Sequence, residues 1–170
     1  MLPPEYQTKE LTARLGRYHY PLGRVPKMEE KNDKSVEETI VEILARNPDS
    51  RYVKGIPILL AKNHVDYGKL SRLADSEGVV NQLGYVLETT QKLFQKNFVT
   101  CNDDNLGKAV EQLWKMRSPE PQFLDRGWEG NKGYLKLIST KADYLGLKEK
   151  WGVVTLFEFN DFKRNFELYK

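Results

Sequence analysis

The chain has 170 residues, of which 39% are hydrophobic and 30% are charged, a length that suits one domain burying roughly 70% of its unfolded surface. A membrane span is not expected, because the longest apolar run covers residues 56–61 and a bilayer needs roughly 20 apolar residues. The net charge of +3, from 27 basic and 24 acidic residues, is too small to predict a nucleic-acid partner by itself.

The start of the chain lacks the basic residues and the apolar block of a secretory signal. Cys101 is the only cysteine, so an internal disulfide is excluded. Both observations predict a cytoplasmic protein. We interpret Cys101 as a loop residue without a chemical role, because a catalytic thiol needs a partner and neither histidine is near it in the sequence.

Residues 1–34 predict an irregular N-terminal arm, because prolines and glycines are spread through them and only residues 11–20 favour local order. Cations and aromatic rings alternate in this arm, a mixture typical of segments that contact phosphates and stack on bases. The simpler interpretation is an arm that wraps the domain and buries its tyrosines. The nucleic-acid-binding alternative rests on Arg14, Arg17, Tyr18, Tyr20 and Arg24.

Residues 35–117 predict a helical region. Ser35 and Glu38 have the spacing of a capping box ahead of an apolar period of 3.6 residues, and Asn47-Pro48 ends this first helix. The same period predicts further helices over residues 51–62, 66–77, 79–96 and 103–116. A strand is the rival interpretation of residues 56–60.

Gly84 lies inside the longest predicted helix, where glycine costs about 1 kcal/mol relative to alanine. We expect another helix or an aromatic ring to approach the backbone closely there. Glu88, Thr89 and Thr90 are assigned to the solvated side of the same helix.

Residues 118–170 predict a mixed region. Residues 134–138 and 152–157 are rich in aromatic and branched side chains and predict a small antiparallel sheet, with room for a helical turn over residues 140–150. Residues 161–169 predict a terminal helix that docks on the core. The expected fold is therefore a predominantly helical α+β domain over residues 35–170, with about five helices, this sheet and the terminal helix.

Residue patterns that carry chemistry are missing. His19, His64 and Cys101 are too far apart to predict a metal site. The glycines of residues 126–133 lack the strand-to-helix context and the Lys-Ser or Lys-Thr pair of a phosphate loop. We therefore predict a protein that is not an enzyme and that has no cofactor.

A partner-binding site is predicted at Trp128, because a large aromatic residue beside Arg126 and Lys132 has the composition of an interface hot spot. Burial of Trp128 in the core is the rival interpretation. The nucleic-acid-binding alternative would also use lysines of the C-terminal region, namely Lys132, Lys136, Lys141, Lys148 and Lys150.

Four short segments carry a family resemblance: Ile56-Pro57-Ile58-Leu59-Leu60-Ala61-Lys62-Asn63, Asp66-Tyr67-Gly68-Lys69-Leu70, Gln82-Leu83-Gly84-Tyr85-Val86-Leu87-Glu88 and Lys150-Trp151-Gly152-Val153-Val154. Across residues 35–158 the chain resembles archaeal AbiEi-type antitoxins. The resemblance implies a regulator of a type IV toxin-antitoxin pair, in which a winged helix represses the operon and the antitoxin opposes a nucleotidyltransferase toxin.

The 34 residues before the first predicted helix are too few for a winged helix. The resemblance therefore implies the family's sensing, dimerising or partner-binding part, and it carries over no catalytic residue. We predict a non-enzymatic regulatory or interaction domain that binds a protein partner, with homodimer formation left open.

Overall fold

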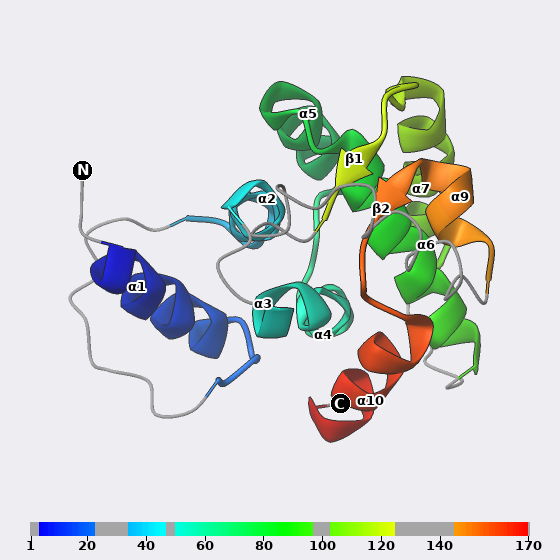
Figure 1. Ribbon diagram of the computed structural model, residues 1–170. Coiled ribbons are helices and arrows are strands. Elements are labelled where there is room, and N and C mark those ends of the chain that lie inside the picture. Colours follow the sequence, from blue (N-terminus) through cyan, green and yellow to red (C-terminus); the bar gives the residue numbers. More distant parts are fainter. Residues whose placement is uncertain (1–3, 23–33, 47–49, 97–102, 125–144, 170) are drawn as a thin grey trace.

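The computed structural model describes residues 4–22, 34–46, 50–96, 103–124 and 145–169 (Figure 1). These residues are mostly helical, as predicted. In chain order the elements are α1 (Pro4–Arg17), α2 (Val36–Arg46), α3 (Ser50–Lys54), α4 (Ile56–Lys62), α5 (Tyr67–Glu77), α6 (Val80–Lys96), α7 (Asp103–Met116), β1 (Gln122–Phe123), α9 (Leu147–Trp151), β2 (Val153–Val154) and α10 (Phe159–Tyr169).

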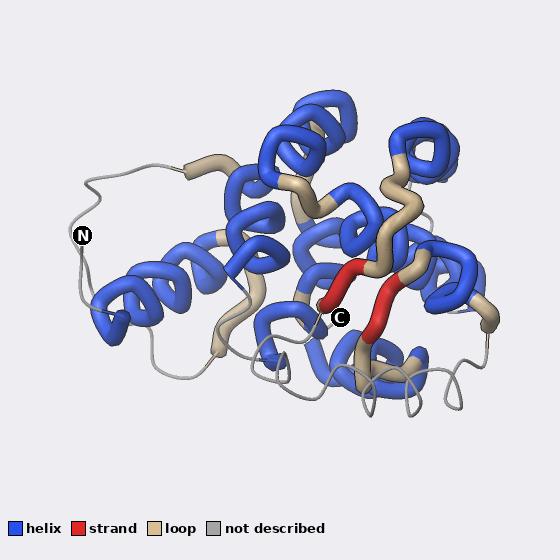
Figure 2. The backbone as a smooth tube through the Cα atoms, turned by 45° about the horizontal axis from the view of Figure 1, so that its top comes forward, coloured by secondary structure: helices blue, strands red, loops and turns tan. Residues whose placement is uncertain are grey.

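Helix α6 is the centre of the fold, because α4, α5, α7, α9 and α10 all pack against it (Figures 1 and 2). Its residues from Val80 to Thr90 are all buried, polar ones included. A helix covered on several sides depends on the rest of the protein for partners to its buried polar side chains. Most of those on α6 have partners, whereas Gln82 Oε1 has none within the described ranges. The end of α9 and the residues after α7 supply such partners to α6, and they form the site described below.

Capping residues bound α2 and α5, and Ser35 acts as the sequence predicts. Ser35 Oγ accepts a hydrogen bond from the Glu38 backbone N–H at 3.2 Å, at the start of α2. Asp66 caps α5 by accepting from the Lys69 N–H at 3.0 Å. Gly78 ends α5 in the left-handed conformation, with φ of 70°, which glycine adopts without strain.

The helix predicted over residues 51–62 is divided at Gly55 into α3 and α4. Pro57 lies in the first turn of α4, where a missing N–H costs nothing, so these residues form a helix and not the rival strand. A Cβ on Gly55 would collide with the ring of Tyr20. Glycine at this position therefore lets the segment after α1 pack against the bend between α3 and α4.

The N-terminal region differs from the irregular arm that we expected. Pro4 begins the 14-residue helix α1, which packs against α2, and Leu11 and Leu15 are buried one turn apart. Proline is compatible with the first helical turn, so Pro4 starts the helix instead of preventing it. Tyr20, beyond the helix, is fully buried. The tyrosine is part of the core, in agreement with the interpretation of a wrapped segment.

The prediction of an antiparallel sheet is wrong, because β1 and β2 pair in parallel, with Gln122 opposite Val153 and Phe123 opposite Val154. Each strand follows a helix in the chain, β1 after α7 and β2 after α9, and the two strands lie side by side in Figure 2. The long connection between them permits the crossover that parallel strands need. The predicted strand over residues 134–138 lies outside the described residues.

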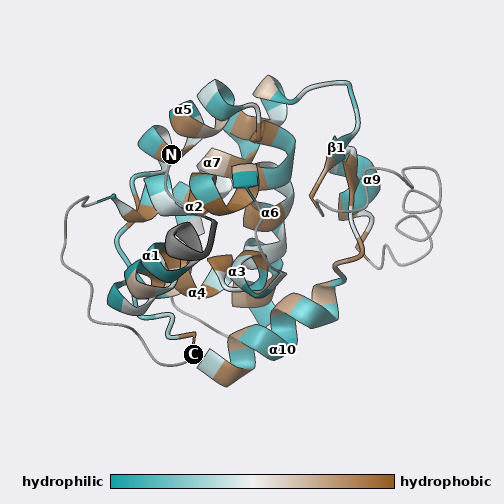
Figure 3. Cartoon of the chain, turned by 60° about the vertical axis from the view of Figure 1, so that its left-hand side comes forward, coloured by the Kyte–Doolittle hydropathy of each residue, from teal (hydrophilic) through white to brown (hydrophobic). Residues whose placement is uncertain are grey.

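Helix α10 closes the fold against α3, α4 and α6, as expected for the C-terminal segment. Phe162 and Phe166 are buried, and the Phe166 ring lies 5.9 Å from that of Phe94 on α6. Tyr169 packs edge-on against Tyr20, with ring centroids 4.9 Å apart. Figure 3 shows the hydrophobic residues of α10 between stretches of hydrophilic ones, as in an amphipathic helix.

Candidate interaction surface on α7 and α9

Trp151, the last residue of α9, packs directly on the backbone of α6. A Cβ on Gly84 would collide with the indole ring, so only glycine allows this approach. Trp151 is 1% exposed. The expectation that an aromatic ring approaches Gly84 is confirmed.

Glu88 is buried and not on a solvated side of α6, so that prediction is wrong. Its exposed fraction is 8%, and both carboxylate oxygens have partners from α9. Trp151 Nε1–H donates to Oε2 at 2.6 Å, and Lys150 Nζ donates to Oε1 at 2.8 Å. These two bonds offset the cost of removing a carboxylate from water. They also fix the orientation of the Trp151 ring.

Thr89 and Thr90 are buried as well, which corrects their assignment to the solvated side. Their hydroxyls donate to the carbonyls of Tyr85 and Val86, each at 2.7 Å. This bond to the preceding turn lets a threonine be buried in a helix without an outside partner.

Trp114, on α7, extends this cluster to the surface. Its ring meets that of Trp151 edge to face, with centroids 5.3 Å apart and an interplanar angle of 87°. The Arg117 guanidinium carbon lies 3.5 Å from the Trp114 ring centroid, and Lys150 Nζ lies 5.3 Å from it. Trp114 is half-buried, whereas Arg117 and Lys150 are exposed. We call these three residues the Trp114 surface.

Asn81 holds the ends of α7 and α9 together beneath this surface. Its side-chain amide donates to the carbonyls of Ser118 at 3.0 Å and Trp151 at 2.8 Å, and its Oδ1 accepts from the Ser118 N–H at 2.8 Å. Asn81 is buried, and these bonds use both of its N–H groups. The backbone on either side of the Trp114 surface is therefore fixed to α6.

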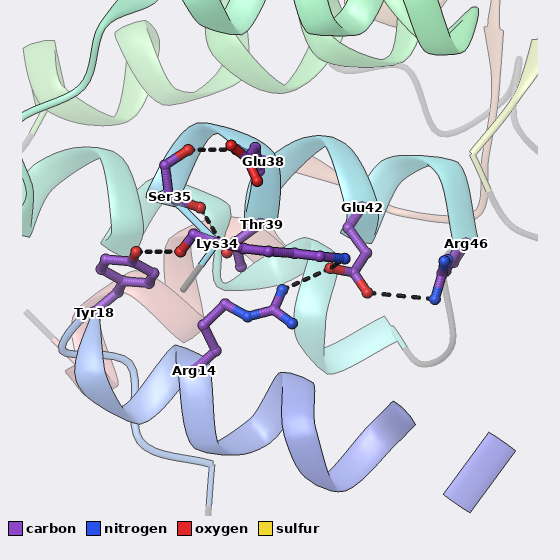
Figure 4. A network of polar contacts seen from close by, with 8 residues as sticks. All are labelled: Arg14, Tyr18, Lys34, Ser35, Glu38, Thr39, Glu42 and Arg46. Carbon is purple, nitrogen blue, oxygen red and sulfur yellow. Dashed lines mark hydrogen bonds and ion pairs between the residues drawn. The ribbon is translucent and has the colours of Figure 1, made fainter. Parts of the chain in front are cut away.

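A half-buried glutamate, Glu42 on α2, binds three cations (Figure 4). Its carboxylate lies 2.6 Å from Arg14, 3.2 Å from Lys34 and 3.4 Å from Arg46. Burial raises the pKa of Glu42, but the hydrogen bonds and charges of Arg14 and Lys34 outweigh this effect and hold the pKa below its ordinary value of 4.5. This network fastens α1 to α2.

A groove of about 290 Å³ lies beside this network, between α2 and α5. Its walls combine apolar side chains with charges of both signs: Lys34, Glu38, Val41, Glu42, Ala45, Arg46, Leu73 and Glu77. The charges are largely paired, since Glu42 binds Lys34 and Arg46, and Glu38 lies 3.5 Å from Lys69. Most charges that line the groove are therefore neutralised by one another, and the lining residues do not include a nucleophile with its base.

The residues of the nucleic-acid-binding alternative are spread between the interior and the surface. Arg14 is 2% exposed and bound to Glu42, and Tyr20 is buried with its hydroxyl donating to the Arg51 carbonyl at 2.8 Å. Tyr18 donates to the Lys34 carbonyl at 2.5 Å. These side chains have roles in packing, whereas Arg17 is exposed.

Several other predicted residues lie outside the described part of the chain: Arg24, Cys101, Arg126, Trp128, Lys132, Lys136 and Lys141. Of the remaining two lysines, Lys148 is buried and donates to the Thr155 carbonyl at 3.2 Å, and Lys150 belongs to the Trp114 surface. His64 is exposed, in the loop between α4 and α5.

The Trp114 surface was not predicted from the sequence. The available signal was an arginine three residues after a tryptophan at the end of a helix, a spacing that brings two side chains together. The contact between Trp114 and Trp151 could not be predicted in this way, because Trp151 lies 37 positions further along the chain.

Among the described residues, no group of three or more His, Cys, Asp or Glu side chains could hold a metal ion. No helix in the same ranges is both long and apolar enough to cross a membrane. A scan against protein-family models and searches of curated proteins and of solved structures find no match to this chain.

Proposed function

We propose that this chain is a non-enzymatic interaction domain that binds a protein partner through the Trp114 surface. The observation that carries the proposal is the exposed Arg117 guanidinium held against the half-buried Trp114 ring. Tryptophan and arginine are enriched among the interface residues that dominate binding energy.

Preorganisation supports this role. Trp114 is positioned by Trp151, which Gly84 and Glu88 fix in turn. Ordering flexible side chains is one of the main costs of association, and a surface already held in place avoids much of it. The buried polar bonds of α6 thus have a use beyond stability.

The charges around the surface favour a protein partner over a nucleic acid. Lys150 is already paired with Glu88, and exposed carboxylates of Glu111, Glu120 and Glu149 lie on or next to the same elements. Proteins that follow a phosphate backbone usually gather cations of one sign on one face. The packing of Arg14 and Tyr20 within the fold weakens the nucleic-acid-binding alternative further.

The resemblance to AbiEi-type antitoxins narrows the proposal to a regulator. On that basis the expected partner is a nucleotidyltransferase toxin. A direct test is co-expression with a nucleotidyltransferase whose gene neighbours that of this chain. Relief of the growth arrest that the enzyme causes would support the regulator, and undiminished arrest would contradict it.

The more general experiment is affinity purification of the full chain from its own host, with Arg117→Ala and Arg164→Ala in parallel. Arg164 is exposed on α10, which packs against α3, α4 and α6, so Arg164→Ala removes the same charge at another place. We expect a partner that is retained by the wild type and by Arg164→Ala and is lost from Arg117→Ala. No partner, or one retained equally by all three proteins, would contradict the proposal.

A further inference from the structure

We infer that Arg117 receives a carboxylate from an acidic segment of the protein partner. This inference rests on the proposed function and adds the chemical class of the partner. Three properties of the Trp114 surface support the inference: the geometry of the guanidinium, the lack of a carboxylate paired with Arg117 within the described ranges, and the rigidity of its support.

The guanidinium has free hydrogen-bonding capacity in a fixed orientation. Arg117 Nη1 donates to the Trp114 carbonyl at 2.6 Å, and the group has five N–H donors in all. Within the described ranges the other N–H groups have no protein partner, and no carboxylate pairs with Arg117. A guanidinium stacked on an aromatic face leaves its edge open, and that edge matches the two oxygens of a carboxylate.

The charges near Arg117 are of both signs. Lys115 is exposed two residues away, and Lys150 Nζ lies 5.3 Å from the Trp114 ring centroid. Glu111, Glu120 and Glu149 are exposed on or next to the same elements, but within the described ranges none of them pairs with Arg117. Glu88 neutralises Lys150 in part, but both oxygens of Glu88 already accept hydrogen bonds. The positive charge of Arg117 is therefore not balanced by the carboxylate buried below it.

Rigidity separates Arg117 from an ordinary surface arginine. A free arginine samples many rotamers and loses that freedom when it binds, which makes exposed ion pairs weak. Stacking on Trp114, together with the Asn81 bonds to the next backbone residue, Ser118, restricts Arg117 before a partner arrives. We expect removal of its side chain to weaken binding of an acidic segment about 10-fold to 100-fold.

The test is a ¹⁵N NMR titration of the full chain with a decaglutamate peptide and, as a neutral control, decaglutamine. The expected result is a shift of the Arg117 Nε–H and Trp114 indole signals with decaglutamate alone. The Trp151 indole should stay unmoved, because its N–H is bonded to buried Glu88. A peptide that leaves the Arg117 signal unmoved would overturn the inference.

Three variants separate recognition by the planar, forked guanidinium of Arg117 from a general effect of positive charge. Arg117→Ala should weaken decaglutamate binding at least about tenfold, and Arg117→Lys should recover only part of the loss because lysine lacks the planar fork. Arg164→Ala should bind as the wild type does. Equal losses in Arg164→Ala and Arg117→Ala, or tighter binding at Arg117 of a single-stranded oligonucleotide of equal charge, would overturn the inference.

The outcome also distinguishes this inference from the proposed function. If a partner is captured through Arg117 but its acidic segments and decaglutamate leave the Arg117 signal unmoved, the carboxylate inference is wrong and the proposed function stands. If decaglutamate binds at Arg117 but the purification yields no partner, the proposed function is contradicted instead.

Discussion

Two glutamates with little exposed side-chain area, one half-buried on α2 and one buried on α6, are satisfied in different ways. Glu42 and Glu88 have nearly equal side-chain exposure, 12% and 10%. Glu42 binds three cations and connects α1 to α2, whereas Glu88 binds one lysine and one neutral indole N–H. The Glu42 network joins two helices, while Glu88 fixes the ring of Trp151, which in turn contacts Trp114 at the surface. Similar burial thus supports a structural link in one region and the exposed surface proposed for partner binding in the other.

The largest expected effect concerns Gly84 beneath Trp151. Gly84→Ala places a methyl group inside the indole ring, so the ring must move and its bond to Glu88 must weaken. We expect a loss of about 3 kcal/mol in the free energy of unfolding, measured in urea.

Gly107→Ala is the matched control, since a Cβ there meets only Gln91, at 3.5 Å, and alanine favours the helix by up to about 1 kcal/mol. If both variants are equally stable, the close approach at Gly84 is not a constraint on the fold.

Trp151→Phe tests the indole N–H separately from the ring. It keeps an aromatic side chain on α6 but leaves one oxygen of Glu88 without its donor. The expected loss is about 2 kcal/mol, and a double-mutant cycle with Glu88→Gln should return a coupling of about 1 kcal/mol or more. Additive effects of the two substitutions would show that the bond contributes nothing.

The Glu42 network should give a pH-dependent contribution. Because the folded pKa of Glu42 is lowered, its ionised form stabilises the protein above the ordinary value of 4.5, and this contribution is lost as pH falls through the folded pKa. Urea unfolding of Glu42→Gln should show a deficit of about 1 kcal/mol at pH 7 that shrinks toward zero below pH 4.5. A deficit that stays constant down to pH 3 would mean that ionisation of Glu42 is irrelevant to stability.

The smallest effect on stability is expected for Arg117→Ala. The side chain is exposed, and a cation over an aromatic ring contributes about 0.5–1 kcal/mol at such a site. Thermal unfolding should therefore change little. A loss of several kcal/mol would instead place Arg117 among the residues that hold the fold together.

The sequence predicts the elements whose ends and contacts have local causes. The side chain of Asp66 and the backbone N–H of Gly78 bound α5, and the unfavourable glycine at position 84 indicates a close approach. Glu88 could not be assigned correctly, because its two partners are 62 and 63 positions away and only folding brings them to α6. The sheet direction was missed for the same reason, since β1 and β2 are distant in the chain. Arg117 near Trp114 was within reach of helical spacing, but its support by Trp151 was not.

The most direct test of the account is calorimetric titration of the purified partner into wild type, Arg117→Ala and Arg164→Ala. We predict binding at least about tenfold weaker for Arg117→Ala alone, with its free energy of unfolding within about 1 kcal/mol of the wild type. Unchanged affinity in Arg117→Ala would contradict the proposal that the partner binds the Trp114 surface, which the buried side chains of α6 hold in place.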